Sequence, residues 1–202
     1  MDFYMIYDKR DIYLLLYTIF LISISYIYFD RYIAHLLYYI DNDILKEFFS
    51  FITKFGRSEW YIIPSIILFL FFIYRSKYDK AKIAIYIFWV NVIAGIIVIF
   101  IKVIFGRARP KLFIEHNIYG FNWFEISHNL TSFPSGHTVT AISTAFAFSY
   151  IFPIYRYIFI IFGLLISISR VIGCNHFISD VLLSIYLGYF VAKILYKRIF
   201  KC

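Results

Sequence analysis

The sequence contains apolar runs that are long enough to cross a membrane. Residues 12–29 hold no Asp, Glu, Lys or Arg, and a helix needs about 20 mostly apolar residues to span roughly 30 Å of hydrocarbon. Hydrophobic residues make up 62% of the 202-residue chain and charged residues 16%. A soluble domain of this length has too little polar surface to cover so much apolar surface. We therefore predict an all-α, polytopic membrane protein that forms a single domain over residues 1–202.

Five further apolar runs follow the first, at about residues 60–74, 81–105, 135–152, 154–172 and 177–195. The run at 60–74 is short, so we expect its helix to begin before Trp60. Pro153 predicts a tight break between the fourth and fifth spans, because proline starts helices better than it continues them. No small-residue cleavage pattern follows the first run, which favours a retained span over a signal peptide. The sequence thus predicts a bundle of about six transmembrane helices.

Charges interrupt the chain between the first and second spans. Within residues 30–59, apolar residues recur at helical spacing between these charges. This pattern is typical of short amphipathic helices that lie on a membrane surface. We expect two such interfacial helices after the first span.

Three polar motifs fall at the ends of predicted spans, and the span count places all of them at the same membrane boundary. They read K-x6-R-P at 102–110, P-S-G-H at 134–137 and S-R-x5-H-x3-D at 169–180. The first and third motifs carry three cations, Lys102, Arg109 and Arg170. Arginine binds phosphate in a bidentate manner, and lysine acts as a point charge. The motifs therefore predict a site for a phosphate group.

The remaining motif residues suit catalysis at that phosphate. Ser135 occupies the N-cap position of the fourth span, where its hydroxyl and the Gly136 amide can meet an anion. His176 and Asp180 are four residues apart, which predicts that they share a helix face. A carboxylate that fixes the histidine tautomer leaves the other ring nitrogen free to attack phosphorus. His137 can then protonate the leaving oxygen and later activate water.

The three motifs resemble those of the type 2 phosphatidic acid phosphatase superfamily of lipid phosphate phosphatases. Every defining position is present, and the resemblance covers roughly residues 60–196, with the core motifs in 102–180. It implies a hydrolase that acts on a lipid phosphate or pyrophosphate through a phosphohistidine, without a metal or another cofactor. It assigns phosphate binding to Lys102, Arg109, Ser135, Gly136 and Arg170, and catalysis to His137 as acid, His176 as nucleophile and Asp180 as its partner.

The resemblance leaves the substrate open. Undecaprenyl pyrophosphate, or a phospholipid such as phosphatidylglycerophosphate or phosphatidic acid, is expected, and a lipid A phosphate is the alternative. The expected partners are this lipid and the bilayer, not nucleic acid, and the oligomeric state is left open. A vanadium-dependent haloperoxidase has a similar anion site but is soluble, unlike this chain. A non-catalytic lipid-binding or scaffold protein would not need both histidines.

The distribution of positive charge predicts the orientation in the membrane. Six spans place both termini on one side, which carries 11 Lys and Arg residues against 9 on the other. The 9 become 6 when Lys102, Arg109 and Arg170, which have a functional reason to be there, are set apart. The positive-inside rule then places the termini in the cytoplasm and the site at the periplasmic or exterior face of a bacterial cytoplasmic (inner) membrane. The net charge of +8 needs no nucleic acid to explain it.

Several other polar residues are expected to have no catalytic part. Arg107 and Lys111 are predicted to lie in solvent or against lipid headgroups. Asn91 is expected to bond across helices, and Cys174 to pack without a disulfide to Cys202. The other histidines, His35, His116 and His128, are expected at the interface or in loops. Residues 111–133 read as a long aromatic loop, which we expect to shape the headgroup entrance together with residues 30–59.

Overall fold

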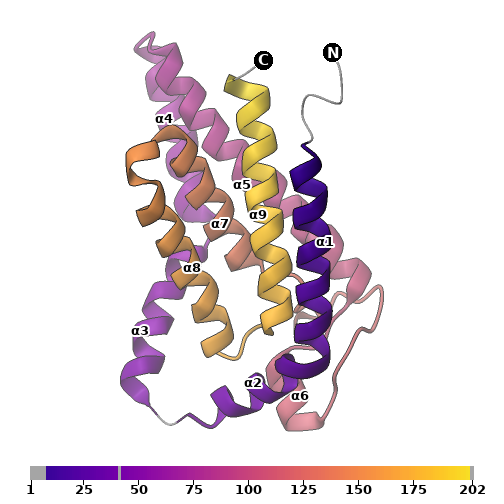
Figure 1. Ribbon diagram of the computed structural model, residues 1–202. Coiled ribbons are helices and arrows are strands. Elements are labelled where there is room, and N and C mark those ends of the chain that lie inside the picture. The colour runs from indigo at the N-terminus through magenta and orange to yellow at the C-terminus, as the bar shows by residue number, and fades with distance from the viewer. Residues whose placement is uncertain (1–7, 41, 201–202) are drawn as a thin grey trace.

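The computed structural model describes residues 8–40 and 42–200, and these residues form helices and no strand. The predicted all-α class is confirmed. Figure 1 shows a bundle of long helices with three shorter ones, α2, α3 and α6, at its lower end. The helices are α1 (Lys9–Ile24), α2 (Asp30–Tyr38), α3 (Asp43–Thr53), α4 (Glu59–Tyr74), α5 (Tyr78–Phe105), α6 (Pro110–His116), α7 (Gly136–Ile151), α8 (Arg156–Ile172) and α9 (Ile178–Phe200).

Among the described residues, five helical stretches are long and apolar enough to cross a membrane, and they correspond to five of the six predicted spans. They are Lys9–Tyr38, Asp43–Tyr74, Tyr78–Phe105, Pro153–Ile172 and Ile178–Phe200. The remaining predicted span is α7, which has only 16 residues. The short turn η5 (Pro153–Tyr155) separates α7 from α8, where Pro153 predicted a break.

Helix α7 forms the centre of the bundle. It packs against α5, α8 and α9, and ten of its 16 residues are buried. Because protein rather than lipid surrounds it, α7 can carry small polar residues along its length. Asn91 of α5 accepts a hydrogen bond of 3.1 Å from Thr144 of α7, which confirms the expected bond between helices.

The outer helices present apolar side chains to their surroundings. In α4 only Ser65 is buried, and residues such as Leu70, Phe100 and Ile158 are 61%, 69% and 65% exposed. Continuous apolar surface of this kind is unfavourable in water but favourable in contact with lipid tails. The protein is therefore an integral membrane protein.

The first two helices are joined without a break. A π-helical turn, η2 (Ser25–Phe29), connects α1 to α2, so the first helix does not end at the end of the apolar run. Asp30, the first residue of α2, is 1% exposed, although a surface position was expected for it. Such π-turns within helices are frequent at functional sites.

The segment at 111–133 is hydrogen-bonded to the end of α5 and is not a free loop. It begins with α6, and its backbone returns to α5 through a 3.0 Å bond from the Asn122 amide to the Gly106 carbonyl. Gly106 ends α5 at a φ of +51°, and a Cβ there would lie 2.8 Å from Cβ of Glu125. Glycine is the residue that allows both this left-handed conformation and the close contact.

The two ends of the described chain lie together. Helices α1 and α9 pack against each other, Lys193 forms an ion pair with Asp11, and Figure 1 shows both ends opposite α2, α3 and α6. This arrangement agrees with an even number of crossings. Asp2, Lys201 and Cys202, which entered the charge count and the disulfide argument, lie outside the described residues.

Candidate active site

The three motifs meet at one end of the bundle. Figure 1 shows the end of α5, the start of α7 and the turn from α8 to α9 in the lower half of the bundle. The Arg109 guanidinium donates a 3.3 Å hydrogen bond to the carbonyl of Asn175, which joins the first motif to the third. Lys102 donates through Nζ to the carbonyl of Thr131, just before the second motif. The expected convergence of these segments is thus present in the fold.

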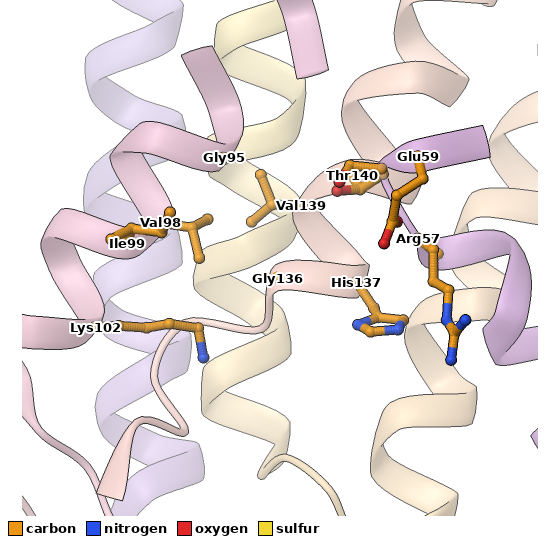
Figure 2. Close-up of a pocket in the computed structure, with 12 residues that line it drawn as sticks. Arg57, Glu59, Gly95, Val98, Ile99, Lys102, Gly136, His137, Val139 and Thr140 are labelled. Atoms are coloured by element: carbon orange, nitrogen blue, oxygen red, sulfur yellow. The ribbon is translucent and has the colours of Figure 1, made fainter. Parts of the chain in front are cut away.

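A cavity of about 600 Å³ opens beside the second motif. We call it the His137 cavity, because His137 lines it together with Lys102 and Gly136. Figure 2 shows the amine of Lys102 and the imidazole of His137 facing the same space from α5 and α7. Its other lining residues are Gly56, Arg57, Ser58, Glu59, Gly95, Val98, Ile99, Val139 and Thr140.

Four buried side-chain atoms have no hydrogen-bond partner within the described part of the chain: Oγ of Ser135, Nε of Arg170, Nε of Arg107 and Oγ1 of Thr138. Of these atoms, those of Ser135 and Arg170 belong to residues that the motifs assign to phosphate binding. Ser135 is fully buried at the N-cap of α7, yet its hydroxyl does not cap the helix and makes no hydrogen bond there. Arg170 is 8% exposed and donates from Nη1 to Oγ1 of Thr53 at 2.7 Å, but its Nε is unpaired. A buried donor without a partner costs about 1–3 kcal/mol. These donors fit a bound anion such as phosphate.

His176 is held as a neutral base in the turn before α9. Its Nδ1 lies 2.8 Å from the carbonyl oxygen of Ser132, and a carbonyl can only accept, so Nδ1 carries the proton and Nε2 is free. Burial lowers the pKa of His176 to about 3, and the charges of Lys102 and Arg170 act in the same direction. The imidazole is therefore uncharged at neutral pH, as a nucleophile requires.

Asp180 lies near His176, but the geometry differs from the expected shared helix face. His176 precedes α9, and its Nδ1 is 3.6 Å from Oδ2 of Asp180, which is longer than a hydrogen bond. Asp180 instead accepts hydrogen bonds from the Ser132 hydroxyl at 2.6 Å and the Phe177 amide at 2.9 Å. The Ser132 carbonyl therefore fixes the tautomer, and the carboxylate supplies negative charge beside the ring.

The prediction that Arg107 lies in solvent or against headgroups is wrong. Arg107 is fully buried and forms ion pairs with Asp180 and, at 2.7 Å, with Asp30. Burial alone would lower the pKa of Arg107, but the two carboxylates raise it above its ordinary value. The guanidinium lies 4.5 to 6.0 Å from the ring centroids of Tyr26, Tyr119, Phe121, Phe133 and Phe177.

The buried ion-pair network Asp30–Arg107–Asp180 links the first helical segment to the candidate nucleophile. Ser179 reinforces it, since its amide and hydroxyl both donate to Asp30. The sequence alone did not reveal this network, because Asp30 and Arg107 are 77 residues apart. The signal that could have found it is a lone aspartate at the end of an otherwise charge-free run.

The other polar residues lie largely where they were expected. Lys111 and three histidines, His35, His116 and His128, are exposed. Cys174 is buried and free. The proposed absence of a bond to Cys202 stays a prediction, because Cys202 lies outside the described residues.

Comparison with known proteins agrees with these observations. The chain is 32% identical to lipid A 1-phosphatases of Rhizobium etli and Rhizobium johnstonii over 71% of its length, which covers 67% and 64% of those proteins. It is 29% identical to a lipid A 4'-phosphatase of Porphyromonas gingivalis, over 78% of this chain and 67% of the relative. The chain thus spans about two thirds of the length of these relatives.

A solved structure shares the fold. The crystal structure of a transmembrane PAP2 type phosphatidylglycerolphosphate phosphatase from Bacillus subtilis superimposes with a TM-score of 0.65 at 21% identity, covering 93% of this chain and 94% of that one. The model of the PAP2 superfamily matches residues 83–202, more than half of the sequence, and this segment contains all three motifs. The chain therefore belongs to the PAP2 superfamily, the family of lipid phosphate phosphatases that its motifs resemble.

Proposed function

We propose that this lipid phosphate phosphatase hydrolyses a lipid monophosphate or diphosphate at the outer face of a bacterial cytoplasmic membrane, with His176 as the nucleophile. The observation that carries this proposal is the pair of unpaired buried donors, Ser135 Oγ and Arg170 Nε, beside a neutral His176 with a free Nε2. Donors that are fixed before the substrate arrives stabilise charge without reorganisation during the reaction.

The phosphate is bound by cations and by the start of α7. Lys102, Arg109 and Arg170 neutralise its charge, and the Ser135 hydroxyl and the Gly136 amide donate to its oxygens at the helix N-terminus. Fixed cations do here what Mg²⁺ does in many other phosphoryl transfers. We therefore expect activity to persist in EDTA.

The reaction proceeds in two displacements. Nε2 of His176 attacks phosphorus as the bond from phosphorus to the leaving oxygen breaks, and His137 donates a proton to that oxygen. The imidazole becomes cationic as the N–P bond forms, and the carboxylate of Asp180 at 3.6 Å stabilises this charge. His137 then takes a proton from water, which attacks the phosphohistidine and releases inorganic phosphate.

The His137 cavity accommodates the leaving group. It contains the proposed acid, and the side chains of Val98, Ile99 and Val139 give it an apolar wall between α4, α5 and α7. The apolar part of a lipid can bury surface against this wall, whereas a small polar alcohol has almost no apolar surface to bury there. The cavity therefore supports a lipid substrate.

Two groups of lipids are candidates. Undecaprenyl pyrophosphate, phosphatidylglycerophosphate and phosphatidic acid are the substrates that the family resemblance leads us to expect. The similarity to lipid A 1-phosphatases and a lipid A 4'-phosphatase supports lipid A phosphate as the second candidate. All of them present a phosphate at the membrane surface.

A substrate panel tests the proposal. Purified protein in detergent with EDTA is given phosphatidic acid, phosphatidylglycerophosphate, undecaprenyl pyrophosphate and lipid A, and inorganic phosphate is measured. We expect release from at least one lipid, inhibition by orthovanadate, and no release by the His176→Asn variant. Equal release by wild type and variant would contradict the assigned nucleophile, and no release from any lipid would point to a non-catalytic lipid-binding protein.

A further inference from the structure

The turn between α3 and α4 reaches the catalytic residues, although it lies outside the segment at 83–202 that matches the family. It consists of η3 (Lys54–Gly56) and its flanking residues. Oγ1 of Thr53 accepts the 2.7 Å hydrogen bond from Arg170. A Cβ on Gly56 would lie 2.8 Å from Cβ of His137 and 3.0 Å from Cγ2 of Ile166. The turn thus contacts both a phosphate-binding arginine and the proposed acid, and only glycine allows the second contact.

Arg57 follows this glycine and faces the His137 cavity. It lines the cavity together with His137 and Lys102, and Figure 2 shows its guanidinium level with the imidazole of His137, on the side away from Lys102. Its side chain is exposed, and in the part of the chain that the structure describes it makes no ion pair. Arg57 is therefore a cation with its donors available to a ligand.

The position of Arg57 places it on the leaving-group side of the reaction. The cavity contains the group that protonates the leaving oxygen, whereas His176, which attacks from the opposite side of phosphorus, does not line it. A substituent bound beyond His137 would therefore lie next to Arg57. The carboxylate of Glu59 also lines the cavity, and Figure 2 shows it above the imidazole of His137, whereas the guanidinium lies beside the ring.

The leaving groups of lipid monophosphates and lipid diphosphates are stabilised in different ways. An alkyl monophosphate releases an alkoxide, which needs a proton from His137. A diphosphate releases a lipid monophosphate, whose second pKa is about 6. This leaving group can depart without being protonated, and positive charge beside it stabilises it instead. A guanidinium is the side chain best suited to two oxygens of such a phosphate.

We propose that Arg57 forms a subsite for the second phosphate of a lipid diphosphate, next to the scissile phosphate. The proposal rests on the proposed function and assigns a specificity-determining residue for one of its two substrate classes, the lipid diphosphates. His176 attacks the terminal phosphorus, the bond to the bridging oxygen breaks, and that oxygen leaves on a lipid monophosphate held by Arg57. Water then releases the terminal phosphate from His176.

Two lipids that differ by one phosphate test the subsite. Phosphatidic acid and diacylglycerol pyrophosphate, each labelled in its terminal phosphate, are compared by initial rates in the same detergent. The measured quantity is the ratio of kcat/KM for the diphosphate to kcat/KM for the monophosphate. Because each variant serves as its own reference, this ratio is independent of how much protein folds.

The matched control is Lys54→Gln, which removes an exposed cation from the same turn but outside the cavity. We expect Arg57→Gln to lower the ratio about tenfold or more, since a charge-assisted hydrogen bond contributes on the order of one such factor. Lys54→Gln should leave the ratio within twofold of wild type. His137→Gln should raise the ratio, because the alkoxide depends more on its proton.

An Arg57→Gln ratio equal to that of wild type would overturn the subsite, and so would an equal fall in Lys54→Gln, which would indicate a general effect of surface charge. Wild-type protein that hydrolyses only the monophosphate would also overturn it while leaving the proposed function intact. Release of phosphate from neither lipid, nor from the other lipids of the panel, would instead contradict the proposed function itself.

Discussion

At the scale of single residues, the tautomer of His176, the proposed nucleophile, depends on a backbone carbonyl. The Ser132 oxygen accepts the Nδ1 proton of His176, and the hydroxyl of the same residue donates to Asp180. Ser132 therefore positions both the proposed nucleophile and the nearby carboxylate. The side chain of Ser132 donates to Asp180, and the carbonyl of Ser132, 2.8 Å from Nδ1 of His176, selects the tautomer.

The neutral state of His176 predicts how stability depends on pH. Burial lowers the pKa of His176 to about 3, whereas a histidine in the unfolded chain has a pKa of about 6.5. Between these values the unfolded chain binds a proton that the folded chain does not, so the folded state loses stability as pH falls from about 6.5 toward 3. His176→Asn removes this group and escapes the loss.

We therefore expect the melting temperature of wild type to fall more steeply than that of His176→Asn as the pH is lowered from 7 to 4. Thermal unfolding of both proteins in the same detergent measures the difference. Parallel curves over this range would show that His176 is not buried in its neutral form.

The buried pair of Arg107 and Asp30 predicts a large loss of stability when it is broken. Asp30→Asn keeps the shape of the side chain but removes a charge that the fully buried guanidinium needs. Breaking a buried pair in this way costs about 3–5 kcal/mol, which lowers Tm by about 10 °C in a chain of this size. Asp43→Asn, an exposed residue in the first turn of α3, is the matched control. Equal melting temperatures for both variants would contradict the central role of this pair.

At the scale of elements, the segment at 111–133 has two parts, which meet where Trp123 packs against Phe121. Tyr119 and Phe121 pack around Arg107, so they support the site from behind. Trp123 and Phe124 are 57% and 77% exposed and are the aromatic residues of this segment that can reach a lipid. Deleting residues 118–124 would remove both parts, so it cannot test the headgroup entrance.

Substitution of Phe124 tests the entrance, because Trp123 also packs against Phe105 and Phe121. We expect Phe124→Ser to raise KM for phosphatidic acid several-fold and to leave KM for a short water-soluble phosphate ester nearly unchanged. The reason is that only the lipid buries apolar surface against this ring. Steady-state kinetics on both substrates measures this, and an equal rise in both KM values would exclude a lipid contact here.

At the scale of the whole molecule, the sequence predicted the elements well and their contacts poorly. Apolar runs locate α1, α4, α5, α8 and α9 because lipid requires length and apolarity in each span. The motif residues were found because the residues within each motif lie close together in sequence, at the end of a predicted span. The apolar run also located α7, but not its central position, which follows from packing against three neighbours.

The missed parts of the site share a physical cause. The bond from Arg170 to Thr53 joins residues 117 apart, and the pairing of Arg107 with Asp30 joins residues 77 apart. The acceptor for His176 is a backbone carbonyl, which has no residue signature. Contacts of these kinds depend on tertiary packing, which no local spacing encodes.

The orientation in the membrane is open to direct measurement. With Cys174 and Cys202 replaced by Ser, a single cysteine is placed at Ser127, near the site, or at Tyr155, at the other end of the bundle. If the site faces outward, a membrane-impermeant maleimide labels Ser127→Cys in intact spheroplasts and Tyr155→Cys only after lysis. The reverse pattern would place the active site in the cytoplasm.

The central claim is that His176 carries the phosphoryl group during turnover. Wild-type protein is mixed with a lipid of the panel that it hydrolyses, labelled with 32P in its terminal phosphate, and quenched within milliseconds in alkaline denaturant, where phosphohistidine survives, and the labelled peptide is sequenced. We predict label on His176, and neither label nor turnover in His176→Asn. Label on another residue, or turnover that persists in the variant, would contradict the account.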